Sequence, residues 1–196
     1  MDLKLIELLK FTERQNQMTK HIHILGASGS GTTTLGQRIE KELGFKHLDT
    51  DDFLWMPTNP PFKEIRYVDD RIKLLNENLD SHERWVLSGS LCGWGDYLMD
   101  EFDLVIYLRI PKDIRMKRLE LREKERLGNA ILEGNSHHDT FIKFMEWAAL
   151  YDEGGLDIRS KALHYNWIEK LNCKVLRIEE DISLENKMRL IKEILD

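Results

Sequence analysis

A run of nine small residues constrains the fold of this chain more than any other feature. Residues 26–34 read Gly-Ala-Ser-Gly-Ser-Gly-Thr-Thr-Thr and follow directly after the strand-like run Ile22–Leu25. Apolar residues then recur every four positions from Leu35 to Leu43, and Gly44 stands where the predicted helix ends. The chain is therefore predicted to form a strand, a tight glycine turn and a helix in that order, which is how a parallel α/β unit begins.

The spacing of this run matches a phosphate-binding loop, G-x-x-x-x-G-K-[ST], with Gly26 and Gly31 in place. Its glycines allow positive φ and let consecutive backbone N–H groups surround phosphate oxygens, and the helix that follows adds its positive end. The Thr33 hydroxyl is predicted to contact a Mg²⁺ ion that bridges the phosphates of ATP. The residues predicted to bind the nucleotide are Gly26, Ala27, Ser28, Gly29, Ser30, Gly31, Thr32, Thr33 and Thr34.

One residue departs from the pattern, because Thr32 stands where the motif has lysine. The lysine ammonium normally neutralises charge on the transferred phosphoryl group. Either another cation takes over this role, or the chain binds nucleotide without turning it over. Glycine- and serine-rich runs are also commonly plain loops, but the strand before and the helix after this one favour a phosphate-binding loop.

The remaining composition indicates one globular domain. The net charge of −6, from 29 basic and 35 acidic residues, argues against broad nucleic-acid binding. Apolar runs are too short to cross a membrane, and charged residues interrupt the N-terminus, which is unlike a signal peptide. The two cysteines, Cys92 and Cys173, are too few for a disulfide framework, so we expect a cytoplasmic protein.

Strands and helices are predicted to alternate along the chain. Residues 1–19 are predicted to form an N-terminal helical extension, and residues 20–196 the main domain. Short apolar strands separated by helices indicate a parallel sheet covered on both faces. Further strands are predicted at residues 46–49, 85–88, 104–109 and 174–178, and helical periods at residues 65–79, 141–148 and 184–195.

Ligands of such folds bind at the carboxyl ends of the strands, so polar residues that follow a strand are candidates. Asp49 and Asp51 follow the second strand, and side chains two apart on an extended segment point the same way. They can hold Mg²⁺ or accept a proton from an attacking hydroxyl group. The alternative is a solvated turn in which Asp52 or Thr50 caps the next segment.

The third strand is followed by a loop with three glycines, in which Ser90, Trp94 and Asp96 are candidates for a substrate-binding wall. A simple glycine-rich loop is the alternative interpretation. Cys92 is interpreted as a small packed thiol, since no histidine lies near it in the sequence.

After the fourth strand, Pro111 is predicted to open a helix that Gly128 closes. Four arginines recur on it at intervals of three and four, which predicts one basic stripe. A solvated, salt-bridged helix face is the alternative for any single arginine. The stripe contains Arg115, Arg118, Arg122 and Arg126. His137, His138 and Asp139, farther along, are interpreted as a polar loop and a helix cap rather than a metal site.

The order of these features resembles the adenylate kinase–shikimate kinase group of P-loop small-molecule kinases, from about Lys20 to the C-terminus. This resemblance rests on the glycine loop, Asp-x-Asp after the second strand, residues 103–111 and Arg-Leu-x-x-Arg at 118–122. It implies a three-layer α/β/α fold, a five-stranded parallel sheet in the order 2-3-1-4-5, and a helical lid at about residues 118–160. The run at 26–34, residues 88–96 and residues 55–62 also look like a bacterial subgroup labelled adenylate kinase-like or ATPase.

The resemblance also implies roles for single residues. Arg118 and Arg122 correspond to lid arginines that touch adenine and phosphate. Residues 158–163 look like the helix that supplies another phosphate-binding residue, for which Arg159 or Lys161 is the candidate. Asp49 and Asp51 fall on a pair in which one carboxylate is near Mg²⁺ and the other holds the substrate hydroxyl group. The wider set of substrate candidates is Arg66, Ser90, Trp94, Asp96 and Lys161.

The expected function is therefore that of an ATP-dependent kinase acting on a small metabolite or nucleotide, as a monomer or homodimer. Residues 55–80 lack the nucleoside-monophosphate motifs of adenylate kinases, so AMP is weakly supported as the acceptor. Thr32 favours the alternative, a protein that binds ATP or GTP for regulation with little turnover.

Overall fold

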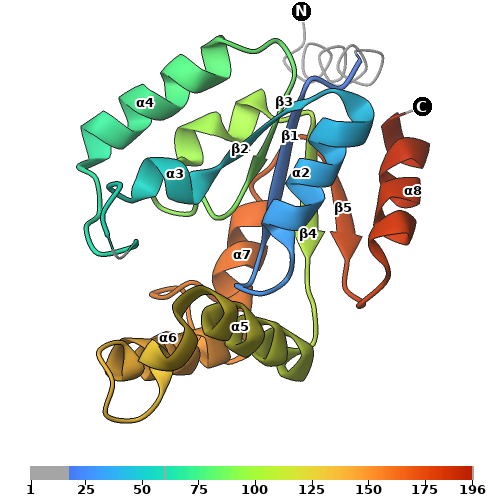
Figure 1. Cartoon of the computed structure of the whole chain (residues 1–196). Coiled ribbons are helices and arrows are strands. Elements are labelled where there is room, and N and C mark those ends of the chain that lie inside the picture. The colour runs from blue at the N-terminus through green and yellow to red at the C-terminus, as the bar shows by residue number, and fades with distance from the viewer. Residues whose placement is uncertain (1–17, 60, 196) are drawn as a thin grey trace, which may run out of the picture.

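The computed structural model describes residues 18–59 and 61–195, so the predicted N-terminal helix lies outside the described residues. The chain forms one parallel five-stranded sheet in the order β2-β3-β1-β4-β5, as the sequence predicts (Figure 1). Its strands are β1 (His21–Gly26), β2 (Lys46–Asp49), β3 (Trp85–Ser88), β4 (Leu104–Leu108) and β5 (Lys174–Ile178).

Helices cover both faces of the sheet. The α-helices are α2 (Thr32–Leu43), α3 (Thr50–Leu54), α4 (Val68–Asp80), α5 (Lys112–Leu127), α6 (His138–Ala149), α7 (Lys161–Ile168) and α8 (Leu184–Leu195). Three short 3₁₀ helices are η1 (Asp96–Glu101), η2 (Gly128–Ile131) and η3 (Leu150–Asp152). None of the described helices is long and apolar enough to span a membrane.

The alternation of side chains along β1 divides the core into two layers. Ile22 and Ile24 point to one face, where they join a cluster with residues of α2 and α8. Leu25 points to the other face, where it joins residues of α3, α4 and α7. Because both faces of β1 are buried, this strand reads as a nearly continuous apolar run.

Helices α5 and α6 lie together beyond the carboxyl end of the sheet (Figure 1). Pro111 directly precedes α5, and Gly128 directly follows it with a positive φ of 55°. The predicted start and end of this helix are thereby confirmed. The α5–α6 segment lies beside the turn that contains the glycine loop.

Two predicted helices begin later than expected. The period that starts at Ile65 becomes helical only at Val68, because Ile65 pairs with Trp55 in an antiparallel bridge. The helix expected around residues 158–163 begins at Lys161, where the Ser160 hydroxyl caps it by accepting a bond from the Leu163 N–H at 2.9 Å. Arg159 therefore lies in the loop before α7.

Candidate active site

The glycine loop between β1 and α2 owes its conformation to two kinds of constraint. Gly29 and Gly31 have positive φ values of 81° and 89°, which side chains with a Cβ rarely adopt. Gly26 and Gly29 also lie against backbone: a Cβ on Gly26 would lie 2.5 Å from the Leu108 carbonyl oxygen, and one on Gly29 would lie 2.8 Å from that of Arg115. The loop is thus held closely between β4 and α5.

This loop has the properties of an anion site. Gly31 caps α2, and the first turn of α2 contains no acidic residue that would compete for its positive end. The Ser30 hydroxyl is buried and has no hydrogen-bond partner among the described residues. A bound phosphate group would satisfy these donors, so the residues present fit the nucleotide that the motif predicts.

A chain of hydrogen bonds connects the loop to the ends of β2 and β3. The Thr33 hydroxyl donates to Asp49 Oδ2 at 2.7 Å, and the Ser88 hydroxyl donates to the same oxygen at 2.9 Å. His47 Nε2 lies 2.9 Å from Ser88 Oγ. Since the Ser88 proton is directed to Asp49, His47 must donate through Nε2, which defines its neutral tautomer. Burial lowers the pKa of His47 and so favours that neutral form.

The pair Thr33 and Asp49 provides two adjacent oxygen ligands, which suits Mg²⁺ because this ion keeps several waters and takes its other ligands from phosphates. A metal site made only of protein ligands needs more side chains than this pair. In the described part of the chain, no group of three or more His, Cys, Asp or Glu side chains is arranged to hold a metal ion. His137 and His138 instead contact Ser136 Oγ at 2.9 Å and the Ile131 carbonyl at 3.0 Å.

Asp49 and Asp51 lie close together for a different reason from the one expected. Asp51 is not on an extended segment but in the first turn of α3, and its N–H donates to Asp49 Oδ1 at 3.0 Å. Asp49, rather than Asp52 or Thr50, caps this helix. Burial and the neighbouring Asp49 charge raise the pKa of Asp51, while the positive charge of Arg159 opposes them. The geometry therefore joins one carboxylate to the loop and sets a second one beside it.

The predicted stripe of four arginines divides into separate environments. Arg115 is fully buried and pairs with Asp152 at 2.7 Å. Its other donors reach the Ile110 and Ser28 carbonyl oxygens at 3.1 and 3.4 Å. Arg115 thus ties the glycine loop to the base of the α5–α6 segment, a structural role that sequence reasoning missed.

The other three arginines of α5 lie nearer the surface. One Arg118 nitrogen contacts both carboxylate oxygens of Asp181, at 2.9 and 3.0 Å. Arg122 and Arg126 both pair with the buried Glu123. The Arg122 guanidinium also lies over the Phe144 ring, 5.7 Å from its centroid.

Three further basic candidates lie outside α5. Arg159 lies 5.6 Å over the Trp147 ring, and its charge acts on Asp51, which indicates that it faces the acidic pair. Lys161 is the half-buried first residue of α7. Arg66 donates to the Phe53 and Trp55 carbonyl oxygens at 3.0 and 3.3 Å, so it fastens the segment after α3.

The loop after β3 is held mostly by its own contacts. Asp96 Oδ1 accepts bonds from the Gly93 N–H at 3.0 Å and from Trp167 Nε1 at 2.8 Å. Trp94 donates to the Ser90 carbonyl at 3.1 Å, and its ring packs against the core. Burial raises the pKa of the Cys92 thiol to about 11, which disfavours the reactive thiolate.

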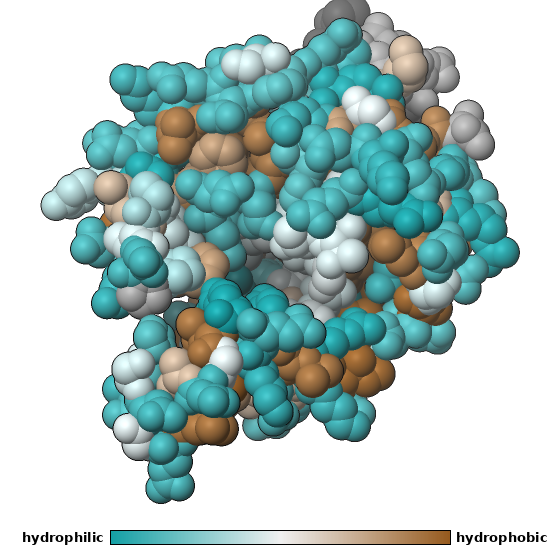
Figure 2. Space-filling view, in the orientation of Figure 1, coloured by the Kyte–Doolittle hydropathy of each residue, from teal (hydrophilic) through white to brown (hydrophobic). Residues whose placement is uncertain are grey.

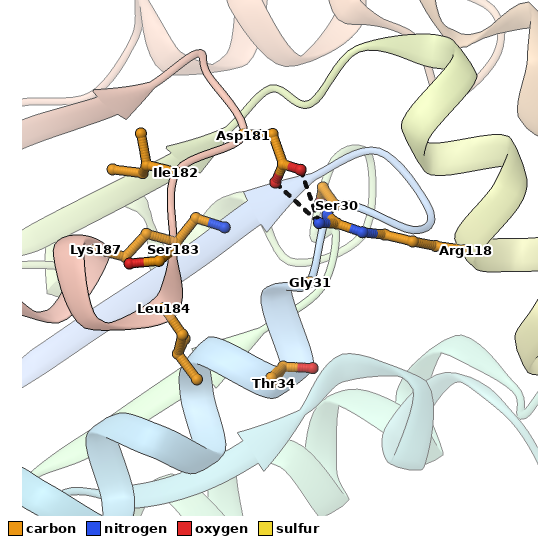
Figure 3. A pocket seen from close by; sticks show the side chains of 9 residues that line it. All are labelled: Ser30, Gly31, Thr34, Arg118, Asp181, Ile182, Ser183, Leu184 and Lys187. Atoms are coloured by element: carbon orange, nitrogen blue, oxygen red, sulfur yellow. Dashed lines mark hydrogen bonds and ion pairs between the residues drawn. The ribbon is translucent and has the colours of Figure 1, made fainter.

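A cavity of about 380 Å³ lies beside the glycine loop (Figure 3). It is lined by Ser30, Gly31, Thr34, Arg118, Asp181, Ile182, Ser183, Leu184 and Lys187. Figure 2 shows a hollow near the centre of this face of the molecule, bordered mostly by hydrophilic and near-neutral residues. Sequence reasoning missed Asp181 and Lys187, although Lys187 lies on the apolar stripe of α8, which is an unusual place for lysine.

Comparison with known proteins agrees with this geometry. Residues 22–139 match the AAA domain family. The uncharacterised protein YqaC of Bacillus subtilis is 47% identical over 178 residues, which cover 91% of this chain and 98% of that protein. Shikimate kinase 2 of Sodalis glossinidius is 46% identical over 48 residues, 24% of this chain and 28% of that protein. Adenylate and cytidylate kinases are also among the relatives.

A solved structure shows the same fold. The deoxyadenosine kinase from M. mycoides with bound dATP superimposes with a TM-score of 0.54. It is 15% identical in sequence, and the match covers 89% of this chain and 98% of that one.

Proposed function

We propose that this chain, which belongs to the AAA domain family and is similar to shikimate and adenylate kinases, transfers a phosphoryl group from ATP to a small acceptor. The observation that carries the proposal is the Thr33–Asp49 contact of 2.7 Å beside Asp51. Two adjacent oxygens, a second carboxylate and the glycine loop thus lie at one end of the sheet, and this arrangement supports a site there for a metal and a nucleotide.

The loop residues 26–34 would hold the phosphates of ATP through backbone N–H groups and the Ser30 hydroxyl. Thr33 and Asp49 would hold Mg²⁺, which neutralises charge on the phosphate oxygens when bound. Ser88 and His47 support this role, because their hydrogen bonds fix the Asp49 carboxylate in one orientation.

Asp51 would hold the acceptor hydroxyl group and take its proton. Its raised pKa supports this role, because a carboxylate that binds a proton more readily is a better general base. Arg159 acts on the same carboxylate and would neutralise charge on the transferred phosphoryl group, together with Arg118 and Arg122. The acceptor would therefore bind in the cleft between α3, the loop before α7 and the α5–α6 segment.

A nucleotide-binding regulatory protein is the second candidate, and Thr32 is the observation that favours it. Loss of the loop lysine removes a charge that is normally present in the transition state. The two functions differ in their products, because only the kinase forms a phosphorylated acceptor.

The Asp51→Asn substitution tests the proposed role of this carboxylate. An amide cannot accept the hydroxyl proton, so we expect ADP formation with the acceptor to fall by about 100-fold or more, while the Kd for Mg-ATP stays within about twofold. Calorimetry gives the affinity, and a coupled assay with sugars, polyols and nucleosides gives the turnover. If ATP affinity collapsed instead, Asp51 would belong to the nucleotide site and not to the acceptor site.

A further inference from the structure

We propose that Lys187 of α8 binds the phosphate chain of the nucleotide and supplies the positive charge that is absent at position 32. The inference rests on the proposed function, because it concerns the same nucleotide site. The glycine-loop motif places its lysine within the loop itself, so it does not predict a role for a lysine on the last helix.

The position of the Lys187 side chain carries the inference. The residue is only 7% exposed, and its ammonium group points from α8 into the cavity, toward the glycine loop (Figure 3). Ser30, Gly31 and Thr34 line the same cavity, so the ammonium faces the loop that is built to surround an anion.

The charge of Lys187 has no ion-pair partner within residues 18–59 and 61–195. Asp181 is a carboxylate that lines the same cavity, but Arg118 already binds both of its oxygens. The other arginines of α5 have carboxylate partners of their own, in Asp152 and Glu123. Of the described cations that line this cavity, Arg118 and Lys187, Lys187 is therefore the one without a carboxylate partner.

The stem of Lys187 is buried, and its ammonium opens onto the cavity without an ion-pair partner. This placement is costly, because desolvation disfavours the charged form. Desolvation lowers the pKa of Lys187, and the nearby Arg118 charge adds to this effect, while Asp181 partly opposes it. An apolar residue would suit the stripe formed with Met188 and Ile191 better. A phosphate group in the cavity removes this cost, since it pairs the charge and accepts its hydrogen bonds.

The hydrogen-bonding chemistry of the Lys187 ammonium favours the phosphates of the nucleotide over its base as the binding partner. An ammonium donates only, and phosphate oxygens accept only, whereas a purine edge mixes donors and acceptors. Ile182 and Leu184, which line the same cavity, provide apolar surface for a base. Lys187 would thus replace a loop lysine with one that reaches the phosphates from the neighbouring helix.

The test compares Lys187→Met with Lys192→Met, a control on the same helix whose exposed ammonium pairs with Glu42 at 2.7 Å. Affinity for ATP is measured by calorimetry, and affinity for adenosine by displacement of a fluorescent ATP analogue. We expect Lys187→Met to weaken ATP binding by about 10- to 100-fold and to leave adenosine binding unchanged. Lys192→Met should change neither affinity.

A second pair of variants tests the replacement itself. If Lys187 stands in for the loop lysine, Thr32→Lys should restore most of the ATP affinity lost in Lys187→Met. Because Met keeps the apolar stem and removes a charge that has no ion-pair partner, the melting temperature of the nucleotide-free variant should not fall, which would show that the protein still folds.

Three results would overturn the inference: unchanged ATP affinity in Lys187→Met, equal losses for ATP and adenosine, or no rescue by Thr32→Lys. None of these results would contradict the proposed function, because that function does not depend on Lys187. A wild-type protein that binds no ATP at all would instead contradict both proposals.

Discussion

At the scale of single residues, Gly36 and His47 show how one contact decides the identity of two positions. Gly36 lies within α2, where alanine would favour the helix by about 1 kcal/mol. A Cβ at this position would lie 2.4 Å from His47 Cδ2 and 2.5 Å from Nε2. The glycine therefore makes room for the ring that donates to Ser88 and, through it, fixes Asp49.

This contact predicts a change of sign in a double-mutant cycle. Gly36→Ala should lower the melting temperature of the wild type, because the new methyl group displaces the His47 ring. In a His47→Ala background, the same substitution should raise it, because only the gain in helix propensity remains. Thermal unfolding of the four proteins by circular dichroism measures both effects. A gain in stability in the wild-type background would mean that the ring is not confined.

The residues of the proposed site were predictable from the sequence where a short motif places them together. The glycine loop and the Asp49–Asp51 pair were found because each lies within a few positions of a recognisable strand. His47, Ser88 and Lys187 were missed, because each acts on a segment that is distant in the sequence. Only Gly36 in a helix and Lys187 on an apolar stripe left a local signal.

At the scale of helices and strands, α5 shows why a basic stripe was an incomplete description. A helix of 16 residues turns its side chains through every direction, and its neighbours decide what each one meets. The buried Arg115 meets Asp152, Arg118 meets Asp181, and Arg122 and Arg126 share Glu123. The helix α3 was missed for another reason: five residues are too few to show a helical period.

Arg122 and Arg126 provide a matched pair for a test of the α5–α6 segment. Both arginines pair with Glu123, but only Arg122 corresponds to a lid arginine in the kinases that the sequence resembles. Arg122→Ala should lower turnover with ATP and acceptor by at least about tenfold, while Arg126→Ala should lower it by less than about threefold. Steady-state kinetics decides between them. Equal turnover in both variants and in the wild type would mean that Arg122 has no catalytic role and only forms an ion pair with Glu123.

At the scale of the whole molecule, the parallel sheet followed from the alternation of short apolar strands and helices, because parallel strands need crossover connections. The order of its strands was implied by the resemblance to P-loop kinases. The polar interior was not predictable in this way. His23 and His164 are both fully buried, and His164 contacts the Tyr151 hydroxyl at 2.9 Å and the Ser90 hydroxyl at 3.3 Å. Burial lowers the pKa of His23 to about 4 and that of His164 to about 3.

These two histidines predict the pH dependence of stability. Their ordinary pKa is 6.5, so the unfolded chain takes up protons below that pH while the folded protein does not. The free energy of unfolding should therefore fall as the pH drops from about 6.5 toward 4, by about 1.4 kcal/mol per pH unit for each histidine. Urea unfolding at pH 7.5, 6 and 5 measures this slope. A His23→Gln variant should show a shallower slope, and an unchanged slope would assign the effect to other groups.

Transfer of the terminal phosphoryl group of ATP tests the central claim most directly. ATP labelled with ¹⁸O in the γ-phosphoryl group is incubated with the protein, Mg²⁺ and a mixture of small hydroxyl-bearing metabolites, and the products are followed by mass spectrometry. The account predicts a labelled, phosphorylated acceptor formed together with an equal amount of ADP, and no such product without Mg²⁺ or with Asp51→Asn. Label that remains in ATP, or that appears only as inorganic phosphate with every acceptor, would contradict the kinase and support a nucleotide-binding protein instead.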